Sequence, residues 1–186
     1  MIAANTQTEG DMILVTGASG TVGTALVAVL KAGGHRFRAA YHAADKAAAA
    51  AQDGYDAVTI DLTKPDTLPP ALVGVDAVFL LGTGVRRQAE GEKNMLDAAG
   101  AAGIRLLVKQ SIWRAAEEEY ALAHMHRSVE EAIEASGLAW TFLRPNGFMQ
   151  NLSGPMAAAI KATGAIYQPA ADARISFIDA RDIAAA

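Results

Sequence analysis

Short apolar runs alternate with longer stretches of helical pattern along most of the chain. The apolar runs predict six strands, at residues 13–15, 36–41, 57–60, 75–81, 106–108 and 139–143. The stretches between them predict helices at 22–31, 45–52, 66–72, 88–102 and 117–135. Glycines that signal a helix C-terminus follow three of these helices, at Gly33-Gly34, Gly103 and Gly137. Nearly continuous apolar strands that alternate with helices are typical of a parallel sheet covered on both faces.

This alternation predicts an α/β fold with a doubly wound parallel sheet. Crossovers between parallel strands are right-handed, so we expect the strand order 3-2-1-4-5-6. The order reverses beside the first strand, and ligands of such folds bind in the crevice at the carboxyl ends of the strands there.

The two ends of the chain differ from this regular pattern. Residues 1–11 lack the features of a secretory signal and read as a disordered extension, so the main domain is expected at 12–150. Beyond Pro145 the sequence predicts an interrupted helix over 148–162 and short strands at 166–167 and 175–178. Asp179 is a good helix N-cap, but no helix body follows it. We therefore expect 151–186 to form part of a substrate-side lobe that ends in a truncated helix.

Composition narrows the class of protein. Of 186 residues, 52% are hydrophobic and 19% are charged, which indicates a globular domain rather than a disordered one. The net charge is −4 and basic residues are scattered, so no attraction to nucleic acid or to an anionic membrane is expected. The chain has no cysteine, which excludes disulfides and thiolate metal sites and fits a reducing cytoplasm. No apolar run approaches the roughly 20 residues of a membrane-spanning helix.

A glycine-rich turn follows the first predicted strand and opens the first predicted helix. Gly17 permits a tight turn, Gly20 lets a pyrophosphate approach the backbone, and Gly23 lets the helix pack against the strand. Backbone N–H groups and the helix dipole would hold the anion. The turn as a whole, comprising Gly17, Ser19, Gly20, Thr21, Val22 and Gly23, predicts a dinucleotide-binding site. The alternative is a tight strand–helix turn with incidental glycines.

The end of the second strand bears on which dinucleotide is bound. Sites specific for NAD usually place a carboxylate there, against the 2′-hydroxyl of the ribose. This chain has Tyr41 and His42 instead, with Lys46 shortly after, so nothing repels a 2′-phosphate and NADP(H) is favoured over NAD(H). The alternative is that His42 and Lys46 are simply solvent-exposed.

Several segments together resemble the NmrA-like family of atypical short-chain dehydrogenase/reductases. They are residues 15–23 (VTGASGTVG), Asp61-Leu62, residues 75–81 (VDAVFLL), residues 136–151 (SGLAWTFLRPNGFMQN) and residues 175–184 (ISFIDARDIA). The resemblance covers Met12 to Ala186. It implies a Rossmann-type fold that binds NAD(P)H. Some members of this family reduce quinones or other small electrophiles, and others sense the redox state of the dinucleotide without turning it over.

The resemblance also assigns expected roles to individual positions. His42 is expected at the 2′-phosphate, and Asp61 and Leu62 near the adenine. Gly82 and Thr83 are expected beside the nicotinamide-side ribose, with Ser111 near the nicotinamide itself. The substrate side is expected to include Asn146, Gly147 and Phe148.

The superfamily's catalytic Tyr-x-x-x-Lys pair is absent. Tyr120 is followed four residues later by His124, and His126 stands where one reductase branch has a lone lysine. Imidazole suits general acid work near neutral pH, so His126 is the candidate catalytic residue. The alternative places both histidines on a polar helix face beside Arg127. No constellation of metal ligands is present.

Two functions follow as hypotheses. The first is an NAD(P)H-dependent oxidoreductase that transfers a hydride to a quinone or a similar small electrophile, a reaction that needs no tyrosine acid. The second is a non-catalytic redox sensor that acts through a regulatory protein partner. A homodimer is possible in either case. Arg144 is expected to be structural and paired with an acid.

Overall fold

The computed structural model describes residues 11–82, 87–165 and 174–186. Its main sheet contains β1 (Met12–Val15), β2 (Arg36–Tyr41), β3 (Ala57–Thr59), β4 (Ala77–Leu80), β5 (Leu106–Gln110) and β6 (Ala139–Leu143). All the pairings are parallel and the order is β3-β2-β1-β4-β5-β6. The predicted strand order is confirmed, and the fold is a Rossmann-type doubly wound sheet.

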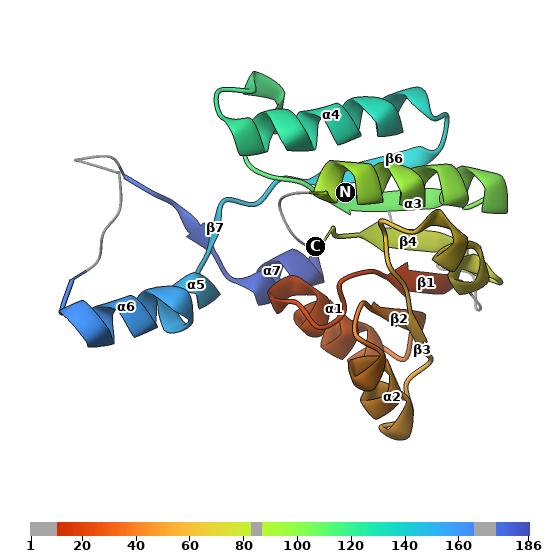
Figure 1. Cartoon of the computed structure of the whole chain (residues 1–186), viewed down its shortest axis with the longest axis horizontal. Coiled ribbons are helices and arrows are strands. Elements are labelled where there is room, and N and C mark those ends of the chain that lie inside the picture. The colour runs from red at the N-terminus through yellow and green to blue at the C-terminus, as the bar shows by residue number, and fades with distance from the viewer. Residues whose placement is uncertain (1–10, 83–86, 166–173) are drawn as a thin grey trace, which may run out of the picture.

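Helices cover both sides of this sheet. On one side lie α3 (Gln88–Ala102) and α4 (Ala121–Ala135), and on the other α1 (Thr21–Ala32), α2 (Ala44–Gln52) and α7 (Ala180–Ala185), as Figure 1 shows. A second, two-stranded sheet of β7 (Gly147–Phe148) and β8 (Phe177–Ile178) stands apart from the first. Together with α5 (Gln150–Ser153) and α6 (Pro155–Thr163) it extends to one side of the domain (Figure 1).

Alternation along the strands produces two cores. Leu14, Val78 and Leu107 face α3 and α4 and have no exposed surface, while Val15 and Phe79 face α1 and α7. Successive side chains of a strand point to opposite faces, so a strand buried on both faces must be apolar throughout. This is why the unbroken apolar runs of the sequence mark these strands correctly.

Several elements differ from their predictions; strand β4, for example, covers Ala77–Leu80 rather than 75–81. The helix expected at 66–72 is a pair of short 3₁₀ helices, Pro65–Thr67 and Pro69–Leu72, because a proline within the segment removes a backbone donor and restricts the residue before it. The helix expected from 117 begins at Ala121 instead. A 3₁₀ turn over Ala115–Glu117 precedes it, and the residues on either side of that turn, Arg114 and Glu118, have positive φ values. Strand β5 runs two residues further than predicted.

On the α1 side, a hollow of about 350 Å³ lies against the sheet, and Leu106, Val108 and Thr141 are among the residues that line it. Helix α7 packs against α1, and Asp179 caps α7 by accepting a hydrogen bond from the Arg181 N–H at 2.8 Å. The extension at 1–10 and the strand predicted at 166–167 lie outside the described residues. Within the described ranges, no helix is long and apolar enough to cross a membrane.

A buried ion pair ties α4 to the end of β6. Glu130 is completely buried and accepts hydrogen bonds from Arg144 at 2.9 and 2.7 Å, while Arg127 contacts it at 3.3 Å. Burial alone would raise the pKa of the Glu130 carboxyl, but the hydrogen bonds from Arg144 outweigh it and the pKa lies below its usual value. The prediction that Arg144 is a structural partner of an acid is confirmed. The pair fixes where the chain leaves β6 for the substrate side.

Replacing Glu130 should show how much this pair contributes. We expect Glu130→Gln to lower the free energy of unfolding by about 3 kcal/mol, because the Arg144 guanidinium loses its charged partner. Chemical denaturation at neutral pH measures this. The matched control is Glu131→Gln, whose exposed carboxylate lies 3.4 Å from Arg127. It should cost less than about 0.5 kcal/mol. Equal effects from the two variants would contradict the structural role.

Candidate functional site

The glycine turn has the close backbone approaches that its three glycines require. Gly17 adopts φ +63°, a left-handed conformation that favours glycine. A Cβ on Gly23 would lie 2.1 Å from the Gly17 carbonyl oxygen, so only glycine fits there. Around Gly20 there is more room, since its Cβ would meet only the Gly17 oxygen, at 3.2 Å. The turn therefore has a structural glycine at each end and an open position in the middle.

The N-terminus of α1 is free to receive an anion. Gly20 occupies the N-cap and provides no side-chain cap, and its own N–H bonds to the Gly17 carbonyl at 2.9 Å. The N–H groups of Thr21, Val22 and Gly23 make no hydrogen bond with any other described residue. Unpaired donors at the positive end of a helix dipole suit a phosphate group. The turn thus fits the pyrophosphate of a dinucleotide.

The strand-order reversal between β1 and β4 is held by a buried hydroxyl. Thr16 Oγ1 donates to the carbonyls of Phe79 and Leu81, at 3.2 and 3.0 Å, and accepts from the Leu81 N–H at 2.8 Å. The Ala18 N–H bonds to the Ala40 carbonyl of β2. These bonds join the glycine turn to the strands on both sides of it, so the turn and the crevice keep a fixed geometry.

Three adjoining hollows follow the sheet edge from β2 to β6. The smallest, about 40 Å³, is lined by Thr16, Gly17, Ser19, Ala40, Tyr41, His42, Ile60 and Leu62. The second, about 330 Å³, is lined by His42, Asp61, Leu62, Thr63, Arg87, Gln88 and Gly91. The third is a cleft of about 470 Å³, and it shares Gln88 with the second. Shared lining residues make the three one continuous track.

Six of the predicted cofactor residues line the first two hollows: Gly17, Ser19, Tyr41, His42, Asp61 and Leu62. His42 and Lys46 are exposed, whereas Leu62 is buried. Asp61 accepts hydrogen bonds from the Thr63 hydroxyl at 2.7 Å and from the Thr63 N–H at 3.0 Å, which lower the pKa of its carboxyl. Arg87 lines the second hollow too and pairs with Glu90. Sequence reasoning did not single out Arg87.

The third hollow contains Gly82, Ser111, His126 and the predicted substrate-side residues. Its lining residues are Leu81, Gly82, Gln88, Gln110, Ser111, Ile112, Leu122, His126, Pro145, Asn146, Gly147, Phe148 and Asn151. The Ser111 hydroxyl helps to lower the pKa of the buried Glu130 carboxyl, whereas Gln110 Oε1 is buried without a hydrogen-bond partner. Such atoms are costly unless a ligand or water satisfies them. Gly82, Ser111, His126 and the substrate-side residues are therefore brought together, and Thr83 lies outside the described residues.

A buried cluster of charged and polar side chains lies next to this cleft. Lys109 on β5 donates to Glu92 Oε2 on α3 at 2.5 Å, and neither side chain is exposed. Its ammonium also lies 3.3 Å from His126 Nδ1 on α4. The other oxygen of Glu92 accepts from the Gly82 N–H at 2.9 Å and from Gln88 at 3.0 Å. The cluster links the cleft to the predicted ribose position.

The two histidines of α4 have different environments. His124 is 73% exposed and pairs with Glu118, whereas His126 is only 7% exposed. The alternative that put His126 on a polar, solvated helix face is therefore wrong. Burial and the Lys109 charge lower the pKa of His126 to about 4. Tyr120 is not part of the cleft, and its hydroxyl donates a hydrogen bond to the Trp113 carbonyl at 2.8 Å.

The sequence pattern does not single out Glu92 or Lys109. Lys109 directly follows the apolar run that predicts the fifth strand, and Glu92 occupies one position of a long, mostly polar helix. Their pairing depends on the register of β5 against β4 and on the face that α3 presents. A lysine directly continuing a buried strand was the one available signal, because a charge there needs a buried partner.

The track along the sheet edge and the anion-binding turn define a nucleotide-binding Rossmann domain. Residues 9–186 match the model of the NmrA-like family, and the chain belongs to this family. It is 37% identical to the NAD(P)H azoreductase of Xenophilus azovorans over 94% of this chain and 61% of the relative. It is 32% identical to the photosystem II assembly factor Ycf39 of Synechocystis over 92% of this chain and 56% of the relative.

A solved structure supports the same assignment. The NADPH-dependent quinone oxidoreductase of Escherichia coli, complexed with NADPH, superposes with a TM-score of 0.83 at 28% identity, covering 94% of this chain and 62% of that one. The chain thus spans less than two-thirds of the length of these relatives. The family and its NAD(P)H-binding fold are shown.

Gly20 offers a test that separates cofactor binding from folding. We expect Gly20→Ala to weaken NADPH binding tenfold or more, because a methyl group there occupies the approach to the anion site. The fold should lose no more than about 1 kcal/mol, since the backbone at φ −81°, ψ 173° suits alanine. Titration calorimetry and thermal unfolding measure the two effects. The control is Gly100→Ala on α3, where no atom lies within 4 Å. Unchanged NADPH affinity in Gly20→Ala would contradict the assignment.

Proposed function

We propose that this chain belongs to an NAD(P)H-dependent oxidoreductase that reduces a quinone or a comparable small electrophile in the third cleft. The observation that carries this proposal is the continuous track from the anion-binding turn to a cleft with an unpaired polar atom. A dinucleotide that lies along the track has its reactive end at the cleft, as in other folds of this topology.

The names of two relatives support this substrate class. An azoreductase and a quinone oxidoreductase both act on conjugated electrophiles. The reduced dinucleotide supplies a hydride when it is bound, and a quinone that gains the hydride and one proton from solvent becomes a hydroquinone. The described residues do not offer the tyrosine–lysine pair that an alcohol dehydrogenase uses. This absence favours an acceptor that needs only a hydride and a proton.

The residues along the track have separate roles in this proposal. The turn from Gly17 to Gly23 holds the pyrophosphate, and Asp61 and Leu62 bound the adenine end. Gly82 and Ser111 border the reactive end. Phe148 and Asn146 limit the substrate side, where Asn146 is oriented by a hydrogen bond to Ser176 Oγ at 2.9 Å. The unpaired Oε1 atom of Gln110 is available to a bound ligand.

We further propose a preference for NADP(H). His42 lines both cofactor hollows, Lys46 is exposed on the helix that follows, and Arg87 borders the second hollow. Basic side chains favour a 2′-phosphate, and no carboxylate occupies the end of β2. A cytoplasmic location is consistent with the cysteine-free composition.

The central test measures turnover by the full-length protein. NADPH oxidation should accelerate when a benzoquinone or an azo dye is added. One hydride and one proton convert the quinone to the hydroquinone, whereas an azo dye gives a hydrazine after one such transfer and two amines after a second. Absorbance at the NADPH band measures the rate, and Gly20→Ala serves as the binding-deficient control. No acceleration with any of several quinones and azo dyes would reject the proposal.

His42 allows a test of dinucleotide preference. We expect His42→Asp to weaken NADPH binding about tenfold, because a carboxylate repels the 2′-phosphate, and to leave NADH binding unchanged or improved. Fluorescence titration with both dinucleotides measures the ratio. The matched control is His35→Asp, at the opposite end of β2. A parallel loss for NADPH and NADH would contradict the assignment.

A second candidate function is a dinucleotide-binding regulator. The name of the Synechocystis relative, an assembly factor, favours it. This function predicts binding of both NADP⁺ and NADPH without turnover, together with a protein partner. The turnover assay above distinguishes the two functions.

A further inference from the structure

Lys109 has a hydrogen-bonding pattern that constrains its neighbours. Its ammonium group has three N–H donors and no acceptor. The three atoms within reach are Glu92 Oε2 at 2.5 Å, the Gln110 carbonyl oxygen at 3.3 Å and His126 Nδ1 at 3.3 Å. The first two can only accept.

This pattern determines where the proton of His126 lies. Because Lys109 donates to Nδ1, that nitrogen presents a lone pair and the neutral imidazole must carry its proton on Nε2. Nε2 has no hydrogen-bond partner among the described residues, and His126 lines the cleft. The only N–H of the ring is therefore available to a molecule in the cleft.

The charges around His126 keep the ring neutral. Lys109 from β5 opposes a second positive charge, while Glu92 from α3 and Glu130 from α4 favour one. Glu92 is committed to Lys109, and Glu130 to Arg144, so both carboxylates already have cationic partners. Burial, the largest effect, and the Lys109 charge prevail and hold the pKa of His126 at about 4. At neutral pH His126 is then a hydrogen-bond donor and not a charged acid.

We propose that Lys109, anchored by Glu92, is a positioning residue that fixes His126 as the neutral Nε2–H tautomer, which donates a hydrogen bond to an acceptor atom of the electrophile. This inference rests on the proposed function. The natural acceptor is a quinone carbonyl oxygen or an azo nitrogen, on which negative charge develops as the hydride is added. A fixed, neutral donor stabilises such a charge without reorganising.

The proposal refines the candidate role of His126. A general acid gives up its proton, and His126 was expected to act in that way. A ring whose Nδ1 is already engaged by a cation is a weak base and serves as an electrostatic donor instead. The cleft then recognises electrophiles by an acceptor atom placed over the dinucleotide, in the cleft that Gln110, with its unpaired Oε1 atom, also lines.

The first test is a spectroscopic measurement on the full chain without turnover. Two-bond ¹H–¹⁵N correlation spectra report the tautomer and charge of each histidine, and the His126→Asn variant assigns the signals. We expect His126 to show the Nε2–H form from about pH 8 to about pH 5. Adding menadione with NADP⁺, a pair that cannot react, should shift the His126 Nε2 resonance. A protonated ring or an Nδ1–H tautomer at neutral pH would overturn the proposal, and so would an Nε2 signal unchanged by saturating menadione.

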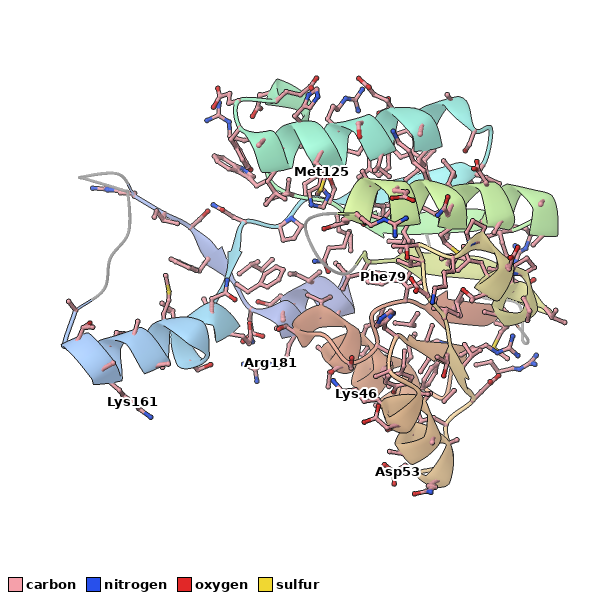
Figure 2. All side chains as sticks on the ribbon, viewed as in Figure 1. Lys46, Asp53, Phe79, Met125, Lys161 and Arg181 are labelled. Atoms are coloured by element: carbon pink, nitrogen blue, oxygen red, sulfur yellow. The ribbon has the colours of Figure 1, made fainter. Side chains whose placement is uncertain are left out.

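The second test removes the ammonium without leaving a buried charge. In Glu92→Gln/Lys109→Met both charges are lost, and a glutamine retains an oxygen for the Gly82 N–H. We expect His126 to take up a proton at higher pH, both tautomers to appear, and kcat with menadione to fall about tenfold, or 1.4 kcal/mol. The control is Lys161→Met, on the part of α6 that projects away from the domain (Figure 2). A folded double variant with the wild-type His126 spectrum would reject the positioning role.

The two tests keep this inference separate from the proposed function. The Nε2–H tautomer and its menadione shift without any turnover would reject the reductase and leave the donor geometry standing. Rapid quinone reduction by a protein whose His126 is protonated at neutral pH would support the reductase and reject the donor role of His126. If the double variant fails to fold, the wild-type spectra decide alone.

Discussion

The carboxylate of Glu92 is the contact through which the parts of the cleft are joined. A buried charge is unstable without partners, and here each oxygen has a separate set. One accepts from the Gly82 backbone and from Gln88, and the other from Lys109. Through these bonds α3, the end of β4 and β5 are held together, and α4 is added through His126. Loss of one member would leave a buried charge unpaired. The geometry of the site and the packing of this side of the sheet therefore depend on the same contacts.

Strand order explains why the two ends of the track differ in chemistry. On the β1–β2 side, the binding groups are backbone donors and a helix N-terminus, which recognise phosphate whatever the side chains are. On the β4–β5–β6 side, side chains form the wall: Gln110, Ser111 and His126. Under the proposed function, the first half binds the cofactor and the second half determines what the cofactor reacts with. This division is consistent with family members whose names describe different substrates.

The fold was predictable from the sequence because its signals are local. Unbroken apolar strands, the spacing of Gly17, Gly20 and Gly23, and the capping Asp179 each act through nearby atoms, and the order of the strands follows from the handedness of the crossovers. The pairing of Arg144 with an acid was also expected. The Glu92–Lys109–His126 cluster was not, because its members are separated by 17 residues at each step and meet only when the register of β5 and the faces of α3 and α4 are known.

The position of His126 is set at two points on the same helix. Glu130 lies one turn after His126 on α4, so the two side chains share a face. Glu130 is held by Arg144 at the end of β6, and His126 by Lys109 on β5, so the helix cannot rotate or slide without breaking a buried polar contact. A ring held in this way has a fixed orientation before any ligand arrives, and the cost of orienting it is met when the chain folds. The same contacts explain how this side of the sheet accommodates three buried charged side chains, Glu92, Lys109 and Glu130, beside a buried histidine: each charge has an oppositely charged partner.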